Sequence, residues 1–361
     1  MNVISEFDGG RMPPLEVQGA QLTFDMTEAP TLFARVETEE SAVTVRLRMK
    51  AKSLGTYEKQ GLIVGDDLRD WRAVPFTRRE DLLVATVPVA KRVWIAHSFP
   101  YLPEHLKQLV VDVEATHRAR ISRIERGGRT VTLFEFGQPP ETATRHHFVI
   151  GGEDAWEGPG AWVAEGVVRT LASDRPEVRR LLETASVRVV PSLSPASVPA
   201  GVQGYLTPDG RAIYGAATWR DAEPPPEVAV VRDLVTDAIR RRTLGFLLTC
   251  HAWWAYYPFS GLDTIEVSSD NRNRLSPERR AAVLRFLHAI IRNVPRGEIN
   301  ITRRIWHAGL ARDYTLAEHN AVTFRTEVTT QDQGLPELRK TGEQLLLNLA
   351  AVDDFSWVFP G

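Results

Sequence analysis

The sequence predicts an α/β protein in which an N-terminal antiparallel β-sandwich precedes a larger domain of alternating strands and helices. Three observations lead to this fold class. The chain has 361 residues, more than one small domain usually contains. Strand-like runs fill the first hundred residues, and strand and helix patterns alternate afterwards. We place the boundary near residue 102, which gives domains of residues 1–102 and 103–361.

The first hundred residues carry strand patterns at close spacing. Residues 43–49 alternate apolar and polar side chains, which is typical of a strand with one face toward solvent. Further strand-like runs cover 61–64, 82–87 and 92–97, and turn-forming or charged segments separate them. Because no helical period lies between these runs, they favour a small antiparallel sandwich.

Helices and strands alternate after residue 102. A helix is expected over 104–116, and a hairpin over 121–136 turns at two central glycines. The Ser-Pro-Glu sequence at 276–278 combines a hydroxyl cap, a first-turn proline and a favourable acid, and the helix it starts extends to about residue 292. Helices of this length between strands predict a sheet covered on both faces. The other expected elements are strands at 148–150, 186–190, 244–250 and 321–329 and helices at 161–171, 226–241 and 335–350.

Composition and charge exclude several classes of protein. Lys and Arg number 44 and Asp and Glu 46, so the net charge of −2 offers no basic surface for nucleic acid. The single cysteine, Cys250, excludes an intramolecular disulfide framework and a cysteine-rich zinc site. The first residues lack the features of a signal peptide, and the most apolar run, 244–259, is too short to span a membrane. We expect a cytoplasmic protein that binds neither nucleic acid nor membranes.

Polar side chains follow three of the expected strands, at the ends where α/β sheets usually form their sites. Asp154 and Glu157 follow the strand at 148–150, and their spacing lets both carboxylates reach one point or, alternatively, cap the next helix. His251 ends another strand, where it is either a ligand or a satisfied core residue, and Glu327 lies in the last strand, where an exposed edge position is the alternative. A catalytic zinc site typically has three protein ligands, and two carboxylates and an imidazole match that number and chemistry. A further carboxylate would serve as general base for the metal-bound water.

The order of these parts resembles that of the zinc carboxypeptidases, specifically the cytosolic-carboxypeptidase branch with its N-terminal β-sandwich, over nearly the whole chain. The junction around Pro100-Tyr101 is similar to the branch's linker between sandwich and catalytic domain. Glu157 followed by the segment 162–166 is similar to the sequence after the family's His-Pro-Gly-Glu zinc motif. The segment ending at His251 resembles the strand of the last zinc histidine, and Thr326-Glu327 resembles the strand of the general base.

The resemblance implies a mixed-sheet α/β/α catalytic domain with a single Zn²⁺ held by Asp154, Glu157 and His251. It also implies Glu327 as the general base and Arg220 as the anchor of a substrate carboxylate. Asp154 replaces the histidine that is the family's first zinc ligand. Because this set carries two negative charges, the bound ion would be a weaker Lewis acid, and Mn²⁺ or another divalent metal would also be accepted.

Further positions depart from the family pattern. Trp219 stands where the family has the asparagine of an Asn-Arg pair, and Tyr314 is the nearest match to the tyrosine of its mobile loop. The segment 189–195 resembles the family strand that usually ends in Asn-Pro-Asp-Gly. The arginine that the family has shortly after this strand has no clear counterpart, since Gly204 falls near its place and Arg211 is a poor substitute. Trp219 and the aromatic run at 253–257 either crowd the proposed pocket or pack in the core.

Other candidate side chains are less suited to the metal. His146 and His147 lie at the opposite end of their strand from Asp154, too far away to reach it. His307 and His319 cannot be placed from the sequence. Strand alternation points Cys250 to the face opposite His251, which favours a buried structural thiol.

The sequence therefore predicts a metal-dependent hydrolase that releases a terminal residue from a peptide or peptide-like amide. Two alternatives stay open. One is a catalytically degenerate relative that binds a peptide or a partner through the former cleft, which the altered ligand, Trp219 and the missing arginine favour. The other is an amidohydrolase that acts on a small N-acyl amino acid. Retention of Glu157, His251, Arg220 and Glu327 favours an enzyme.

Overall fold

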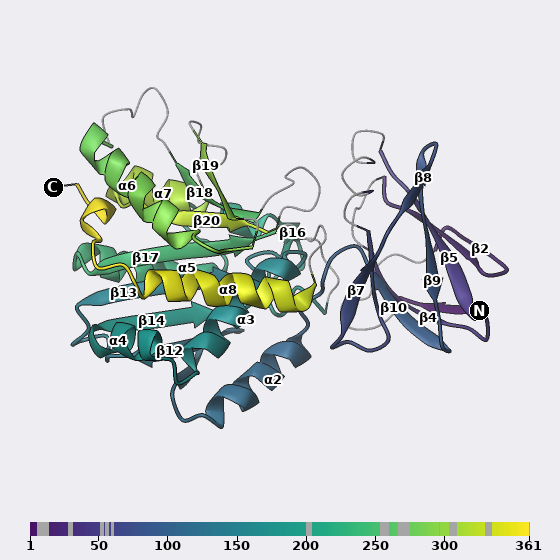
Figure 1. The fold of residues 1–361 in the computed structure, drawn as a ribbon, viewed down its shortest axis with the longest axis horizontal. Helices are drawn as coiled ribbons and strands as arrows, with labels where there is room; N and C mark the ends of the chain where they lie inside the picture. The colour runs from purple at the N-terminus through teal and green to yellow at the C-terminus, as the bar shows by residue number, and fades with distance from the viewer. Residues whose placement is uncertain are drawn as a thin grey trace.

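The molecule has two lobes (Figure 1). The smaller lobe ends with β10 (Arg92–Ala96) and the larger begins with α2 (Pro103–Glu114), so the chain passes between them over residues 97–102. The computed structural model describes residues 1–5, 14–27, 32–50, 54, 58, 61–199, 204–252, 260–265, 275–295, 297–302, 309–328 and 334–360. For residues 260–265 and 300–302 it describes the backbone but not the side chains.

The smaller lobe is a sandwich of two five-stranded sheets. Its other strands are β1 (Asn2–Ile4), β2 (Glu16–Gln18), β3 (Gln21–Asp25), β4 (Phe33–Glu37), β5 (Ala42–Arg48), β6 (Leu62–Gly65), β7 (Trp71–Val74), β8 (Thr77–Arg79) and β9 (Leu82–Pro88). The sheet orders are β1-β4-β10-β6-β7 and β2-β3-β5-β9-β8, and every pair is antiparallel except β3 with β5. Val43, Val45 and Leu47 of β5 point into the core between the sheets, as their alternation predicts.

The larger lobe is built on a mixed sheet of eight strands. They are β11 (Arg120–Arg126), β12 (Arg129–Gly137), β13 (Arg145–Gly151), β14 (Ala185–Val190), β17 (Leu244–His251), β18 (Ser260–Ile265), β19 (Gly297–Thr302) and β20 (Phe324–Glu327). Their order is β11-β12-β14-β13-β17-β20-β18-β19, in which β14, β13, β17 and β20 run parallel. A separate short hairpin joins β15 (Tyr205–Leu206) to β16 (Ala212–Ile213).

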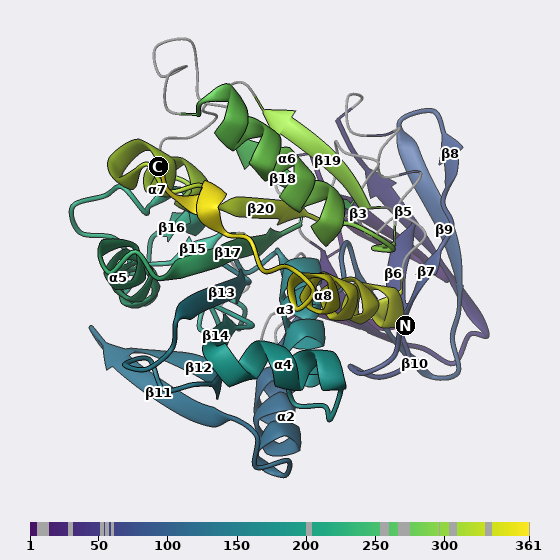
Figure 2. The same ribbon diagram turned by 60° about the vertical axis from the view of Figure 1, so that its left-hand side comes forward.

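Helices lie on both faces of this sheet, with α5 and α7 on one side and α3, α4, α6 and α8 on the other (Figure 2). The predicted fold class is therefore confirmed. Ser276 caps α6 by accepting a hydrogen bond from the Arg279 N–H at 3.2 Å, as its sequence predicts. The helices after α2 are α3 (Gly158–Leu171), α4 (Pro176–Thr184), α5 (Pro226–Arg240), α6 (Pro277–Ile290), α7 (Ala311–His319) and α8 (Leu335–Leu349), with single 3₁₀ turns η1 (Gly215–Ala217) and η3 (Ser356–Val358). Among these described helices, none has the length and apolar composition that crossing a membrane requires.

The elements of the larger lobe differ from the predicted ones in two ways. The last strand spans only Phe324–Glu327, because the Ala321 N–H bonds to Thr315 and the Val322 N–H to Val358 instead of joining the ladder. The strands β18 and β19 and the helices α4 and α7 were not among the expected elements.

The two lobes pack against each other through apolar side chains. Phe33 and Trp94 of the sandwich belong to the buried cluster of the larger lobe and not to the core between the two smaller sheets. In the connecting segment, the Tyr101 ring meets the Trp162 ring edge-on with centroids 4.8 Å apart. The Trp162 indole N–H donates to the Pro100 carbonyl at 3.2 Å, so the linker is fixed against α3.

The first turn of α3 approaches β17 so closely that position 160 requires glycine. A Cβ atom there would lie 2.0 Å from the Cys250 carbonyl oxygen, a contact that only a backbone shift removes. We expect Gly160→Ala to lower the free energy of unfolding by about 3 kcal/mol or more, because overpacking a rigid contact displaces the strand. Urea denaturation measures this loss.

Gly334→Ala is the matched control for this substitution. A Cβ atom at Gly334 would meet the end of the flexible Glu337 side chain at 2.9 Å and no backbone atom. Its cost should stay within about 1 kcal/mol. Equal losses in the two variants would contradict the assigned contact between α3 and β17.

Candidate active site

Three strand ends meet at one edge of the large sheet. In register, Gly151 of β13 lies beside Cys250 of β17, and His251 of β17 lies beside Glu327 of β20. Because these strands are parallel and adjacent, their carboxyl ends face the same side. The turn after β13, which contains Glu157, reaches the same edge. The structure therefore brings together the segments that were singled out in the sequence.

The imidazole of His251 lies between two glutamates. Its Nδ1 is 2.8 Å from Glu157 Oε1, and its Nε2 is 2.7 Å from Glu153 Oε2. None of these three residues is more than 2% exposed. Burial disfavours the charged ring, but the two carboxylates outweigh it and raise the pKa of His251 to about 10. Without a metal, the ring therefore carries a positive charge at neutral pH.

Glu153 is a site residue that the sequence did not reveal. Its other oxygen, Oε1, accepts a hydrogen bond from the Trp219 indole N–H at 2.7 Å. The sequence left open whether Trp219 crowds the pocket or packs in the core. Trp219 is fully buried and packs in the core behind the site. The one signal for Glu153 in the sequence is its place beside Asp154, and spacing cannot tell which of two neighbouring carboxylates faces the histidine.

Asp154 is turned away from the His251 ring toward the backbone. Its Oδ1 accepts a hydrogen bond from the Gly215 N–H at 2.7 Å, and its Oδ2 accepts one from the Ala216 N–H at 3.4 Å. Burial, together with the charge of Glu157, raises the pKa of the Asp154 carboxyl well above its usual range. The predicted set of three metal ligands is thus not assembled in this arrangement.

Glu157 and His251 nevertheless fit a divalent cation as a pair. Glu157 Oε2 is buried and has no hydrogen-bond partner in the part of the chain that the structure describes. His251 Nδ1 and Glu157 Oε1 are now in hydrogen-bond contact at 2.8 Å, and they would have to separate to about 3.3 Å to become two donors on one tetrahedral zinc ion. Within the same described ranges, no group of three His, Cys, Asp or Glu side chains is arranged to hold a metal. Asp154 would have to leave its two amides to become a third ligand.

Glu327 is buried beside this pair, and not at an exposed edge. Its strand, β20, has β17 on one side and β18 on the other, and its side chain is 3% exposed. The Arg325 guanidinium, two residues earlier on the same face of β20, lies 2.8 Å from Glu327 Oε1. The position of the Glu327 carboxylate is therefore fixed by an ion pair that the sequence analysis did not anticipate.

Glu153, Glu157, His251 and Glu327 form the cluster around His251. Two of the predicted substrate-binding residues make their described contacts with other side chains. Arg220 is exposed and pairs with Glu318 of α7 at 3.0 Å. Tyr314 packs against Trp219, with ring centroids 6.3 Å apart, and its hydroxyl lies 3.2 Å from His319.

A different tyrosine, Tyr214, lies near the acidic residues of the site. Burial and the charges of Glu157 and Asp154 raise the pKa of Tyr214 far above its usual value. It directly precedes Gly215, whose amide binds Asp154. No motif in the sequence singled it out.

The remaining candidates were His307, the aromatic run at 253–257, Cys250, His146 and His147. The aromatic run at 253–257 and His307 lie outside the described residues. Cys250 is buried, and burial raises the pKa of its thiol. His146 and His147 lie at the opposite end of β13, as predicted, where His146 is level with Leu244.

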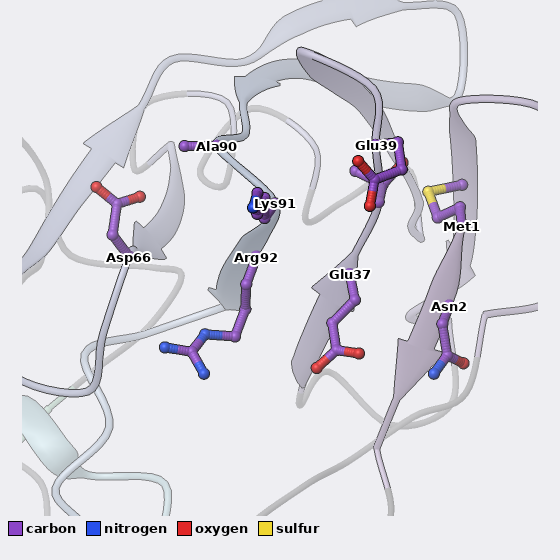
Figure 3. Close-up of a pocket in the computed structure, with 9 residues that line it drawn as sticks. Met1, Asn2, Glu37, Glu39, Asp66, Ala90, Lys91 and Arg92 are labelled. Atoms are coloured by element: carbon purple, nitrogen blue, oxygen red, sulfur yellow. The ribbon is translucent and has the colours of Figure 1, made fainter.

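The described residues line two cavities that lie away from the three strand ends. One, of about 830 Å³, lies in the smaller lobe, where Glu37, Asp66 and Arg92 are among the side chains that line it (Figure 3). The other, of about 480 Å³, lies at the opposite edge of the large sheet and includes Arg145 and His147. Both lining sets mix acidic and basic groups, and neither contains a residue of the cluster around His251.

The solved structures that are similar to this chain include metallo-carboxypeptidases. A metallo-carboxypeptidase from Burkholderia cenocepacia matches with a TM-score of 0.82 and 17% identity over 97% of this chain and 98% of its own. A metallo-carboxypeptidase from Pseudomonas aeruginosa, solved with (2-guanidinoethylmercapto)succinic acid, matches with a TM-score of 0.78 and 19% identity over the same shares. No protein-family model matches the sequence, and no curated protein matches it either. At these identities the likeness establishes the fold, so the chain has a metallo-carboxypeptidase fold.

Proposed function

We propose that this chain is a metal-dependent hydrolase of the carboxypeptidase type, which releases a terminal residue from a peptide or peptide-like amide. The observation that supports this most directly is the contact between Glu157 and His251 with Glu327 beside it in register. In this proposal Glu157 and His251 would be a ligand pair, and Glu327 a buried general base, at the carboxyl edge of the sheet, where α/β proteins usually form their sites.

The chemistry assigns a role to each of these side chains. Glu157 and His251 would hold Zn²⁺ or Mn²⁺, with Asp154 as the candidate third ligand. A divalent cation bound there supplies Lewis-acid activation of water and of an amide carbonyl. Glu327 would accept a proton from the attacking water and deliver it to the leaving amine. Arg325 orients the Glu327 carboxylate through their ion pair.

Arg220 is the residue that would anchor the substrate, and its surroundings bear on the class of substrate. Arg220 would bind a substrate carboxylate in competition with Glu318, its partner at the surface. This competition weakens a strict demand for a free terminal carboxylate. A small N-acyl amino acid, which also carries a carboxylate that Arg220 could bind, is the alternative substrate. The succession of a sandwich (1–102) and a larger domain (103–361) supports a place near the cytosolic-carboxypeptidase branch, with Asp154 in the position of the first zinc ligand.

A second candidate function is a non-catalytic protein that binds a peptide or a partner. The observation in its favour is the position of Asp154, whose oxygens accept hydrogen bonds from the Gly215 and Ala216 amides. In this form the positive charge of His251 offsets one of the two negative charges of Glu153 and Glu157 without a metal.

A substrate panel separates these functions. We expect protein purified without chelators to bind a single divalent ion per chain and to cleave blocked dipeptides, acylated amino acids or peptidoglycan-like peptides in the presence of Zn²⁺ or Mn²⁺. Metal analysis and amine release measure the two properties. Peptide binding without cleavage at any metal would support the non-catalytic protein, and a site that binds no metal would remove the hydrolase proposal.

A further inference from the structure

Behind the proposed ligand His251 lies a buried chain of polar contacts that the proposed reaction does not use. Trp219 Nε1 donates to Glu153 Oε1 at 2.7 Å, and Glu153 Oε2 lies 2.7 Å from His251 Nε2. The opposite ring nitrogen, Nδ1, faces Glu157. The three members of this chain, Trp219, Glu153 and His251, are at most 2% exposed, so water does not compete for these contacts.

The direction of the hydrogen bonds in this chain is fixed by chemistry. An indole N–H can only donate, and a carboxylate can only accept. With Trp219 on one oxygen of Glu153, the other oxygen requires a hydrogen from His251 Nε2. In the metal-free form both ring nitrogens face carboxylates and both carry a hydrogen, and a cation at Nδ1 would take the place of the Nδ1 hydrogen. The neutral imidazole that binds the cation keeps one N–H, and with this hydrogen at Nε2 the lone pair is at Nδ1. That is the nitrogen which faces Glu157 and the proposed cation.

Trp219 is itself firmly held. Its backbone N–H donates to the Gly309 carbonyl at 2.8 Å, and its carbonyl accepts from Arg232 Nη1 at 3.1 Å. Its ring is fully buried. The indole N–H therefore stays aimed at Glu153, and Glu153 cannot exchange the roles of its two oxygens without breaking a buried hydrogen bond.

We propose that Glu153 and Trp219 are positioning residues, which orient the His251 ring and keep its Nδ1 available to a divalent cation. This inference rests on the proposed function for the cation, but it concerns metal binding and not hydrolysis. In metal sites, such carboxylate partners of a ligating histidine typically contribute 10–100-fold in affinity.

Glu153→Gln tests the proposal because the two side chains have the same shape. The amide oxygen of the glutamine would accept the Trp219 N–H, which turns the amide NH₂ toward His251 Nε2. Two donors would then face each other, so the neutral ring must move its hydrogen to Nδ1. We expect the Zn²⁺ affinity of the full chain, measured by competition with a chelator, to fall by about 10–100-fold.

The double variant Glu153→Gln with Trp219→Phe distinguishes positioning from a merely structural role. Without the indole N–H, the glutamine amide is free to rotate and present its oxygen to His251 Nε2. Zinc affinity should then recover by about 10-fold relative to Glu153→Gln alone. If the two residues only support the fold, the double variant should bind zinc no better than the single variant.

Trp162→Phe is the matched control, since Trp162 is equally buried in the same lobe but donates to the Pro100 carbonyl. It should leave zinc affinity unchanged, and circular dichroism confirms that each variant is folded. Unchanged affinity in Glu153→Gln, or no recovery in the double variant, would overturn the proposal, as would absence of zinc binding by the unmodified chain. Zinc binding with the expected pattern but without hydrolysis would remove the proposed function and leave this inference standing.

Discussion

Glu327→Gln should lower kcat by about 10²–10⁴-fold, the usual contribution of a general acid–base residue, and leave metal content unchanged. The substitution keeps the shape of the side chain but removes its ability to take a proton from water. Glu327 lies beside the proposed ligand His251 in register and not within the Glu157–His251 contact, so metal binding should persist. Initial rates on the best substrate of the panel and metal analysis of the same preparation measure both quantities.

Glu104→Gln is a suitable control for this experiment. Glu104 is exposed on α2 and pairs with Lys107 at 3.7 Å, and it has no part in the proposed site. Its replacement should change kcat by less than about 3-fold, since surface ion pairs contribute little. Activity retained in Glu327→Gln would reject its role as the base. A joint loss of activity and metal would instead make Glu327 part of the metal site.

The fold could be predicted from the sequence wherever one face of an element is apolar and the other polar. The alternation at 43–49 and the cap at Ser276 each correspond to an element of the structure. The helix α7 could not be found in this way, because Arg312 and Asp313 in its first turn are buried. Charged residues on the inner side of a helix reverse the pattern that identifies an amphipathic helix.

The sequence predicts those parts of the candidate site that lie at the ends of parallel strands. His251 and Glu327 each end a strand, so knowing the strands was sufficient to place them at one edge. The side chains after β13 could not be placed, because Gly152 adopts a left-handed conformation with φ of 57°. This local turn puts Glu153 against His251 and Asp154 against the backbone amides of η1.

Arg220 shows a second limit of sequence reasoning. Its position in the chain matched a family motif, but the direction of a long exposed side chain depends on neighbours that are distant in sequence. Glu318, 98 residues later, provides that neighbour at 3.0 Å. Pairing of this kind is decided by tertiary packing of α7 and has no local signature.

The stability of the protein should fall as the pH decreases from 6.5 toward 3, partly because of His147. Burial, together with the positive charges of His146 and Arg145, lowers the pKa of His147 to about 3. Between these pH values the unfolded chain binds a proton at this position and the folded chain does not, so acid favours unfolding. The contribution of His147 should reach about 1.4 kcal/mol per pH unit, or roughly 3 kcal/mol between pH 6.5 and 4.

Comparing the pH dependence of stability between the unmodified chain and His147→Gln isolates the contribution of His147. The raised pKa of Asp154 acts in the opposite direction, because the folded state then holds a proton that the unfolded state releases above its own pKa. Urea denaturation at several pH values should therefore show a flatter dependence for His147→Gln than for the unmodified chain, whatever their stabilities at pH 7. His288→Gln, at an exposed position of α6, should keep the unmodified dependence. Parallel curves for His147→Gln and the unmodified chain would contradict this prediction. They would mean that the His147 imidazole gains a proton as readily in the folded state as in the unfolded state. Its burial, the nearby charge of Arg145 and its contact with the Phe355 ring all disfavour a protonated ring in the folded state.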